Sequence, residues 1–302
     1  MDSSRVLTLG AWPALGRSDL DSLLLLALTA FFAATVTGAL GYGFSSITVP
    51  VALLLVTSRT LNPALVIIEL GLNGCAVYLN RHAIRACLPR VAPIVLGILP
   101  GVGIGSLLLD ALDGSTVKLT CYGALLPLAL TQAAGWRWRI RNERAAALPF
   151  GVGIGVLYSL TTISGPPLAL FFNNQGFAKS DFKVSLAVTR LAESTLTSIA
   201  YVALGLFTSQ TWELTGWLLP AVLLGMPLGH MLVHRIAQDV FRRICMSMDV
   251  WIVGFGLSRL IAQTADVPAL LAYQVLVIAA VLDAFLLRRF FASRAASPMN
   301  PR

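Results

Sequence analysis

Charged residues are scarce in this sequence. Only 12% of its 302 residues are Asp, Glu, Lys or Arg, whereas a soluble domain carries about a quarter. Hydrophobic residues make up 57%, and apolar runs of roughly 20 residues recur along the chain, which is typical of a polytopic α-helical membrane protein. The expected apolar segments are 20–40, 44–58, 62–80, 91–110, 117–135, 146–163, 166–174, 182–206, 214–234, 241–262 and 268–288.

Cysteine and histidine are also rare, which excludes several kinds of site. The four cysteines form no CxxC pair, so they favour helix packing over a disulfide framework or a metal site. The three histidines form no HExxH motif, and Ser164 lies in "ISGPP" rather than in a GxSxG motif. We therefore expect no cofactor, no metal and no enzymatic activity. The four cysteines are Cys75, Cys87, Cys121 and Cys245.

Basic residues outnumber acidic ones, with a formal net charge of +8. They lie in short loops between apolar runs and form no basic stripe with aromatics, so we expect no nucleic-acid partner. The positive-inside rule places these loops in the cytoplasm and the Lys- and Arg-poor loops near Asp110–Asp113, Glu213 and Asp266 outside. The sequence thus predicts a multi-pass protein among the lipids of a bacterial inner (plasma) membrane, with its N-terminus outside and its C-terminus in the cytoplasm.

The segment 146–174 lies between two loops that this rule places in the cytoplasm. Its 29 residues are too few for two full crossings, which need roughly 40. Hydroxyl residues, a glycine and two prolines interrupt it in "GVLYSLTTISGPPLALFF". We therefore expect a hairpin of helices broken inside the membrane.

A similar pattern occurs earlier, in "TGALGYGFSSITVPVALLL". An offset of 117 residues places Pro50 on Pro167, and it also aligns Gly38 with Gly155 and Ser45 with Thr162. A further match, of Pro93 with Pro220 and Pro100 with Pro227, follows at an offset of 127. The loop charges give the two halves opposite orientations, as in transporters that bind substrate at paired broken helices.

The predicted fold is therefore an all-α polytopic membrane protein with two inverted repeats. Each repeat is a broken, re-entrant helix hairpin followed by three transmembrane helices, and one extra helix follows at the C-terminus. The predicted parts are an N-terminal segment 1–19, a first repeat 20–135, a basic cytoplasmic loop 136–145, a second repeat 146–262, the extra helix 268–288 and a basic cytoplasmic tail 289–302.

The two breaks suggest an anion site. A helix that starts inside the membrane presents N–H groups and the positive end of its dipole, and nearby hydroxyls add hydrogen-bond donors. The alternative is that these residues only kink and pack helices. The candidate binding residues at the breaks are Ser45, Ser46, Thr161, Thr162 and Ser164.

Arg190 lies inside the apolar segment 182–206, where a charge is costly and usually functional. We expect it to balance the charge of the substrate, with Glu193 on the same helical face orienting it or carrying a proton. Asn73 lies in the matching helix of the first half, close to the position equivalent to Arg190, and could donate amide hydrogens. Glu69, one turn earlier, could carry a proton or could instead face a polar loop. A purely structural Arg–Glu pair is the alternative for Arg190.

Three further charged residues lie near helix ends or have no evident partner. We assign Asp249, Arg259 and Asp283 structural roles. In an alternative function, Glu69, Glu193 and Asp249 form the path of a proton- or cation-coupled carrier or channel. A non-transporting membrane scaffold is a third possibility.

The chain resembles the TauE/SafE sulfite exporter family in "GYGFSSITVP", "GVLYSLTTISGPPLALFF" and the helix "KVSLAVTRLAEST". The resemblance spans nearly the whole chain. It implies movement of small sulfur-containing anions, such as sulfite and sulfonates, across the plasma membrane. Tyr42, Phe44, Ser45 and Ser46 stand where the family motif is richer in glycine. The expected function is thus a secondary transporter that exports a small sulfur oxyanion by alternating access.

Overall fold

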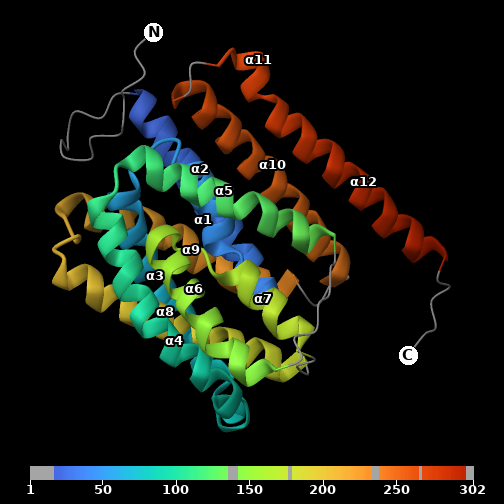
Figure 1. Cartoon of the computed structure of the whole chain (residues 1–302). Helices are drawn as coiled ribbons and strands as arrows, with labels where there is room; N and C mark the ends of the chain where they lie inside the picture. Colours follow the sequence, from blue (N-terminus) through green and yellow to red (C-terminus); the bar gives the residue numbers. More distant parts are fainter. Residues whose placement is uncertain (1–16, 135–141, 176–178, 233–237, 265–266, 297–302) are drawn as a thin grey trace.

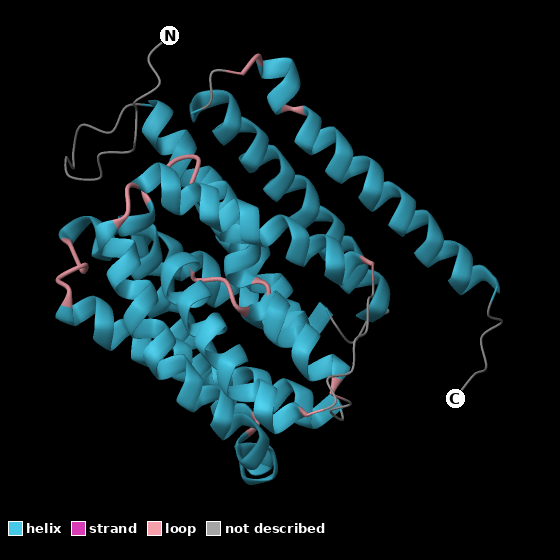
Figure 2. Cartoon of the chain, viewed as in Figure 1, coloured by secondary structure: helices cyan, strands magenta, loops and turns pink. Residues whose placement is uncertain are grey.

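The computed structural model describes residues 17–134, 142–175, 179–232, 238–264 and 267–296. Over these residues the fold consists of helices and short connections, without strands (Figure 2). The helices, labelled as in Figure 1, are α1 Arg17–Leu40, α2 Phe44–Ala52, α3 Ser58–Leu79, η1 Arg81–Ala83, α4 Ile84–Ala111, α5 Gly114–Ala133, α6 Glu143–Thr161, α7 Gly165–Asn174, α8 Lys179–Ala203, α9 Ser209–Leu232, α10 Gln238–Thr264, α11 Ala269–Ala272 and α12 Gln274–Ala296.

Apart from the single turns η1 and α11, two helices are much shorter than the rest. α2 has 9 residues and α7 has 10, so each is roughly 15 Å long, half the thickness of a bilayer core. The chain turns before α2 through Gly41 and Gly43, whose φ values of 84° and 117° suit glycine. The turn before α7 instead uses Thr162, which caps α6 in the left-handed region at φ 58°.

The end of α6 is buried, and other parts of the chain satisfy its carbonyl groups. The hydroxyl of Thr161 donates to Leu157 O at 2.6 Å, and the Asn62 amide donates to Leu160 O at 2.7 Å. The Tyr201 hydroxyl donates to the carbonyl of Ser159. Because unpaired backbone groups are costly away from water, these bonds stabilise a helix end within the bundle.

Glycines let two helix pairs approach closely. A Cβ on Gly97 or Gly101 of α4 would overlap the carbonyl oxygens of Leu148 or Val152 in α6. Gly97 and Gly101 therefore serve helix packing. α1 and α9 meet in the same way, because a Cβ on Gly38 of α1 would overlap the backbone of α9.

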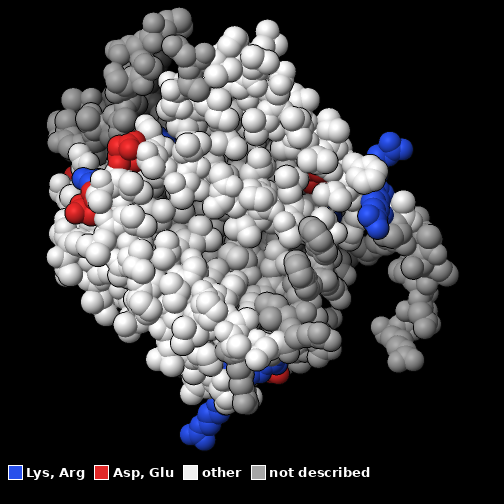
Figure 3. Space-filling view, in the orientation of Figure 1, with Lys and Arg blue, Asp and Glu red and all other residues white. Residues whose placement is uncertain are grey.

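Several helices have the length and composition of membrane spans. Five such segments occur among the described residues, namely Leu20–Leu40, Ser58–Leu79, Arg81–Ala111, Ser209–Leu232 and Ala269–Ala292. Figure 3 shows a broad face with few charged side chains, and Lys and Arg lie mostly at its edges, below the start of α4 and over the later part of α12. The chain is a multi-pass membrane protein.

Some element boundaries differ from those predicted. The extra C-terminal helix extends to Ala296, into the predicted tail 289–302, and a short turn separates its start as α11. α1 begins at Arg17, inside the predicted segment 1–19. Most of the predicted basic loop 136–145 lies outside the described residues.

Candidate functional site

Arg190 lies fully inside the helix bundle. It projects from α8, and its side chain is 2% exposed. In the surrounding stretch of α8, "SLAVTRLAES", polar residues recur between apolar ones at helical spacing and so share one face. Its Nη2 atom lies 2.6 Å from Oε1 of Glu69, which is completely buried in α3. The partner of Arg190 is therefore Glu69, from the other half of the chain, and not Glu193 as the helical spacing suggested.

Glu69 accepts hydrogen bonds on both carboxylate oxygens. The Ser45 hydroxyl, from the first turn of α2, donates to Oε1 beside Arg190. The Tyr158 hydroxyl, from the last turn of α6, donates to Oε2 at 2.7 Å. Glu69 thus joins α2, α3, α6 and α8, and its negative charge is stabilised by three donors.

A second set of hydrogen bonds extends the cluster along α3 and α8. The Asn73 amide donates to Ser194 Oγ at 3.2 Å, and this oxygen lies 3.1 Å from the Tyr158 hydroxyl. Sequence reasoning missed Tyr158 and Ser194 as members of the site. Tyr158 could have been suspected from its place in the interrupted segment, whereas Ser194 carries no such signal.

Glu193 lies three residues after Arg190 and is also completely buried. Its Oε2 accepts a 2.5 Å hydrogen bond from Ser164, the residue before α7. Within the described part of the chain, Oε1 of Glu193 and both Nε and Nη1 of Arg190 have no hydrogen-bond partner. The site therefore combines unused donors on a cation with an unused acceptor on a carboxylate.

The other predicted hydroxyls serve the backbone. Ser46 donates to Gly43 O at 3.1 Å, and Thr162 donates to Thr161 O at 2.7 Å, while Thr161 bonds back to α6 as described above. The predicted row of N–H groups at the start of α7 is also reduced, because Pro166 and Pro167 have none. Ser45 and Ser164, two of the five predicted hydroxyl residues, reach the charged cluster.

Comparison with protein-family models gives a match over residues 26–257, to the family described as sulfite exporter TauE/SafE. The chain belongs to the sulfite exporter TauE/SafE family. The match runs from α1 into α10, so it includes the whole charged cluster. Membership in a family of transporters implies a membrane exporter of sulfite or a related sulfur compound rather than an enzyme. Neither the curated proteins nor the solved structures gave a match.

A second buried ion pair lies at the edge of the TauE/SafE region. Arg243 Nη2 of α10 lies 2.9 Å from Asp283 Oδ1 of α12, and Ser247 donates to the same oxygen at 3.2 Å. Arg243 lies in α10, which begins at Gln238, and its side chain is buried. Asp283 has the predicted structural contact. The side chain of Asp249 lies outside the described residues.

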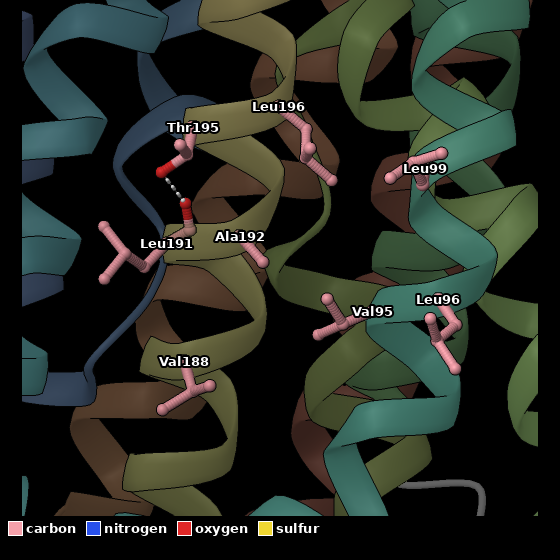
Figure 4. A pocket seen from close by; sticks show the side chains of 8 residues that line it. All are labelled: Val95, Leu96, Leu99, Val188, Leu191, Ala192, Thr195 and Leu196. Atoms are coloured by element: carbon pink, nitrogen blue, oxygen red, sulfur yellow. Dashed lines mark hydrogen bonds between the residues drawn. The ribbon is translucent and has the colours of Figure 1, made fainter.

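A surface groove of about 410 Å³ lies between α4 and α8 and contains none of the charged residues of the site. Figure 4 shows its lining, in which Leu96 and Leu99 of α4 face Val188 and Leu196 of α8. The Thr195 hydroxyl is bonded to Leu191 O at 2.7 Å. This apolar lining does not suit a hydrated anion.

Proposed function

We propose that the protein exports a small sulfur oxyanion, sulfite or an organosulfonate, by alternating access, and that Arg190 binds it between the two short helices α2 and α7. The observation that carries the proposal is the buried guanidinium, whose Nε and Nη1 have no partner among the described residues, in a cluster that includes hydroxyls from the starts of both short helices. These N–H groups match the geometry of an oxyanion. Glu69 and Glu193 are the candidate groups for coupling to protons.

The start of α2 is the better donor of backbone amides. Its first intrahelical hydrogen bond runs from Ile47 N to Gly43 O, so the backbone N–H groups of Phe44 and Ser45 have no acceptor within the helix. In α7 the second and third residues are prolines, so the N–H of Gly165 alone precedes that of Leu168. The Leu168 N–H already bonds to Ser164 O. We propose that α2 supplies most of the amide contacts, and that Ser164 acts through Glu193.

Alternating access requires two halves that can exchange conformations, and we propose that the two halves are inverted repeats. The glycine contacts support this, because α4 packs on α6 in the way that α9 packs on α1. Gly97 and Gly101 meet the carbonyls of Leu148 and Val152, and Gly225 and Gly229 meet those of Phe31 and Thr35. Adding the predicted offset of 117 to the residue numbers of Phe31 and Thr35 gives those of Leu148 and Val152, so the two pairs of carbonyls occupy equivalent positions.

Residues at equivalent positions also contact each other. Glu69 and Arg190 are 121 residues apart, as are Asn73 and Ser194. The same separation relates the starts of α2 and α7 and those of α3 and α8. A side-chain pair formed by equivalent positions lies on the pseudo-twofold axis, so we propose that the anion binds at this axis.

This separation supports an alignment of the breaks that differs from the predicted one. α6 continues to Thr161 beyond Gly155, whereas α1 ends at Leu40 soon after Gly38, so α6 is about one turn longer. Gly38 and Gly155 still match, but Pro50 and Pro167 do not. The position equivalent to Arg190 is that of Glu69, not the neighbourhood of Asn73.

The test is sulfite flux in proteoliposomes. Arg190→Ala should lower the flux on the order of a hundredfold, because a buried charge contact is worth about 2–5 kcal/mol. Arg59→Ala is the matched control, since Arg59 is exposed and pairs with Asp110 at the surface. Glu69→Gln/Arg190→Gln removes both charges and separates loss of binding from misfolding. Unchanged flux in folded Arg190→Ala would contradict the proposal.

One observation favours the alternative of a cation- or proton-coupled carrier. If both buried glutamates are ionised, the cluster of Arg190, Glu69 and Glu193 has one more negative than positive charge, which suits a cation. Asp249 completes the path proposed from the sequence. The sign of the substrate-induced current distinguishes the two functions, and an inward current that depends on a metal cation without any sulfur anion would favour this one.

The membrane orientation follows the same proposal. The loops rich in Lys and Arg place the C-terminus in the cytoplasm of a bacterium and the N-terminus outside. Single-cysteine labelling at Asp113 from outside intact cells would test this orientation.

A further inference from the structure

Two buried glutamates face one arginine, but their surroundings differ. Glu69 receives hydrogen bonds from Arg190, Ser45 and Tyr158. Glu193 receives one, from Ser164, and its Oε1 has no partner within the described residues. A carboxylate buried with a single neutral donor loses far more solvation than it regains, so it is stable there mainly in the protonated form.

The charged and titratable groups around Glu193 come from three helices. Arg190 of α8, Glu69 of α3 and Tyr158 of α6 interact with it or with its neighbours. α7, which supplies Ser164, has no titratable residue in "GPPLALFFNN". In α4, which also packs on α8, the ionisable residues Arg85, Cys87, Arg90 and Asp110 lie towards the helix ends. The charge of Arg190 is already balanced by Glu69, so it is only partly available to Glu193.

We propose that Glu193 carries the proton that moves together with the anion, while Glu69 stays ionised as the counter-ion of Arg190. This inference rests on the proposed anion site. Glu193 and Arg190 share a helical face, so an anion on Nε and Nη1 lies beside the Glu193 carboxyl group. An ionised Glu193 repels that anion, whereas the protonated form can donate its O–H to it.

Proton and anion therefore bind with positive coupling. By linkage, each strengthens the binding of the other by the same factor. The Ser164 hydrogen bond connects this protonation to the start of α7, one of the two short helices. Release of the proton from Glu193 thus weakens anion binding at the same time as it changes the contact that holds the start of α7.

The experiment measures binding of methanesulfonate, which remains a monoanion across the range used, to the purified full-length protein from about pH 6 to about pH 9. For the wild type, affinity should fall roughly tenfold per pH unit at the alkaline end, as one linked proton requires. Glu193→Gln imitates the protonated carboxyl, so its affinity should be independent of pH. In vesicles it should lose accumulation driven by a pH gradient, measured relative to its own rate of anion exchange.

Two variants control this result. Glu193→Asp retains a carboxyl group and should retain the pH dependence, and it serves if Glu193→Gln does not fold. Glu213→Gln, a glutamate of α9 away from the cluster, should behave as the wild type.

Three outcomes would overturn the inference. They are a wild-type affinity that does not change with pH, an unchanged pH dependence in Glu193→Gln, and loss of the pH dependence in Glu69→Gln instead. Failure of the anion site itself is distinct, because neither sulfite nor methanesulfonate would then show any binding that depends on Arg190.

Discussion

The two buried arginines of this protein make similar ion pairs in different surroundings. Arg190 and Arg243 each contact a carboxylate through Nη2, and both leave Nε and Nη1 unpartnered among the described residues. Arg243, however, joins two long helices, α10 and α12, and α12 lies along the edge of the molecule (Figure 1). Arg190 lies between two short helices, beside a second buried carboxylate. A buried arginine alone therefore does not indicate an anion site, and the proposed site rests on the helix starts and polar groups around Arg190.

The largest difference between the pairs is expected on removal of one partner. Asp283→Ala leaves Arg243 buried without a counter-ion, which should lower stability by about 3–5 kcal/mol, while sulfite flux per folded molecule stays at the wild-type level. Glu69→Ala should cause a similar loss of stability together with loss of flux. Thermal unfolding in detergent and flux normalised to folded protein measure the two effects. Loss of normalised flux in Asp283→Ala would show that both pairs belong to the transport site.

An exchange of charges sharpens the comparison. Arg243→Asp/Asp283→Arg retains an ion pair between α10 and α12 and should recover most of the stability lost by either single change. Glu69→Arg/Arg190→Glu puts the arginine on α3, where Tyr158 and Ser45 now face a cation. This second exchange should restore stability only in part and leave sulfite flux undetectable. Restored flux would mean that the side of the pseudo-twofold axis that carries the cation is unimportant.

The smallest effect is expected far from both pairs, at the start of α5. The Thr116 hydroxyl and backbone N–H donate to Asp113 and lower the pKa of this exposed carboxyl group. A lowered folded-state pKa contributes stability above the unfolded pKa that is lost as the pH falls through the folded-state value. Asp113→Asn should therefore lower the thermal midpoint slightly at neutral pH and not at all in acid. An equal shift at both pH values would contradict this role.

The sequence predicted the helical class and the places where helices stop. Glycines, prolines and hydroxyls in two apolar segments indicated the short helices α2 and α7, because these residues interrupt helices in identifiable ways. Boundaries were less accurate, since α12 runs past Arg288 to Ala296 and α10 begins at Gln238 rather than at residue 241. Helix ends depend on tertiary packing as well as on local propensity.

What the sequence determined by itself was the buried position of Arg190, because a charge inside an apolar run has to lie within the bundle. Its partner was decided only by the tertiary structure. Helical spacing offered Glu193, yet packing of α3 against α8 brings Glu69 to Arg190 from 121 residues away and turns Glu193 towards Ser164. Local periodicity determines which residues share a face of one helix, whereas the contact between two faces depends on how distant segments pack, and a single sequence does not show this.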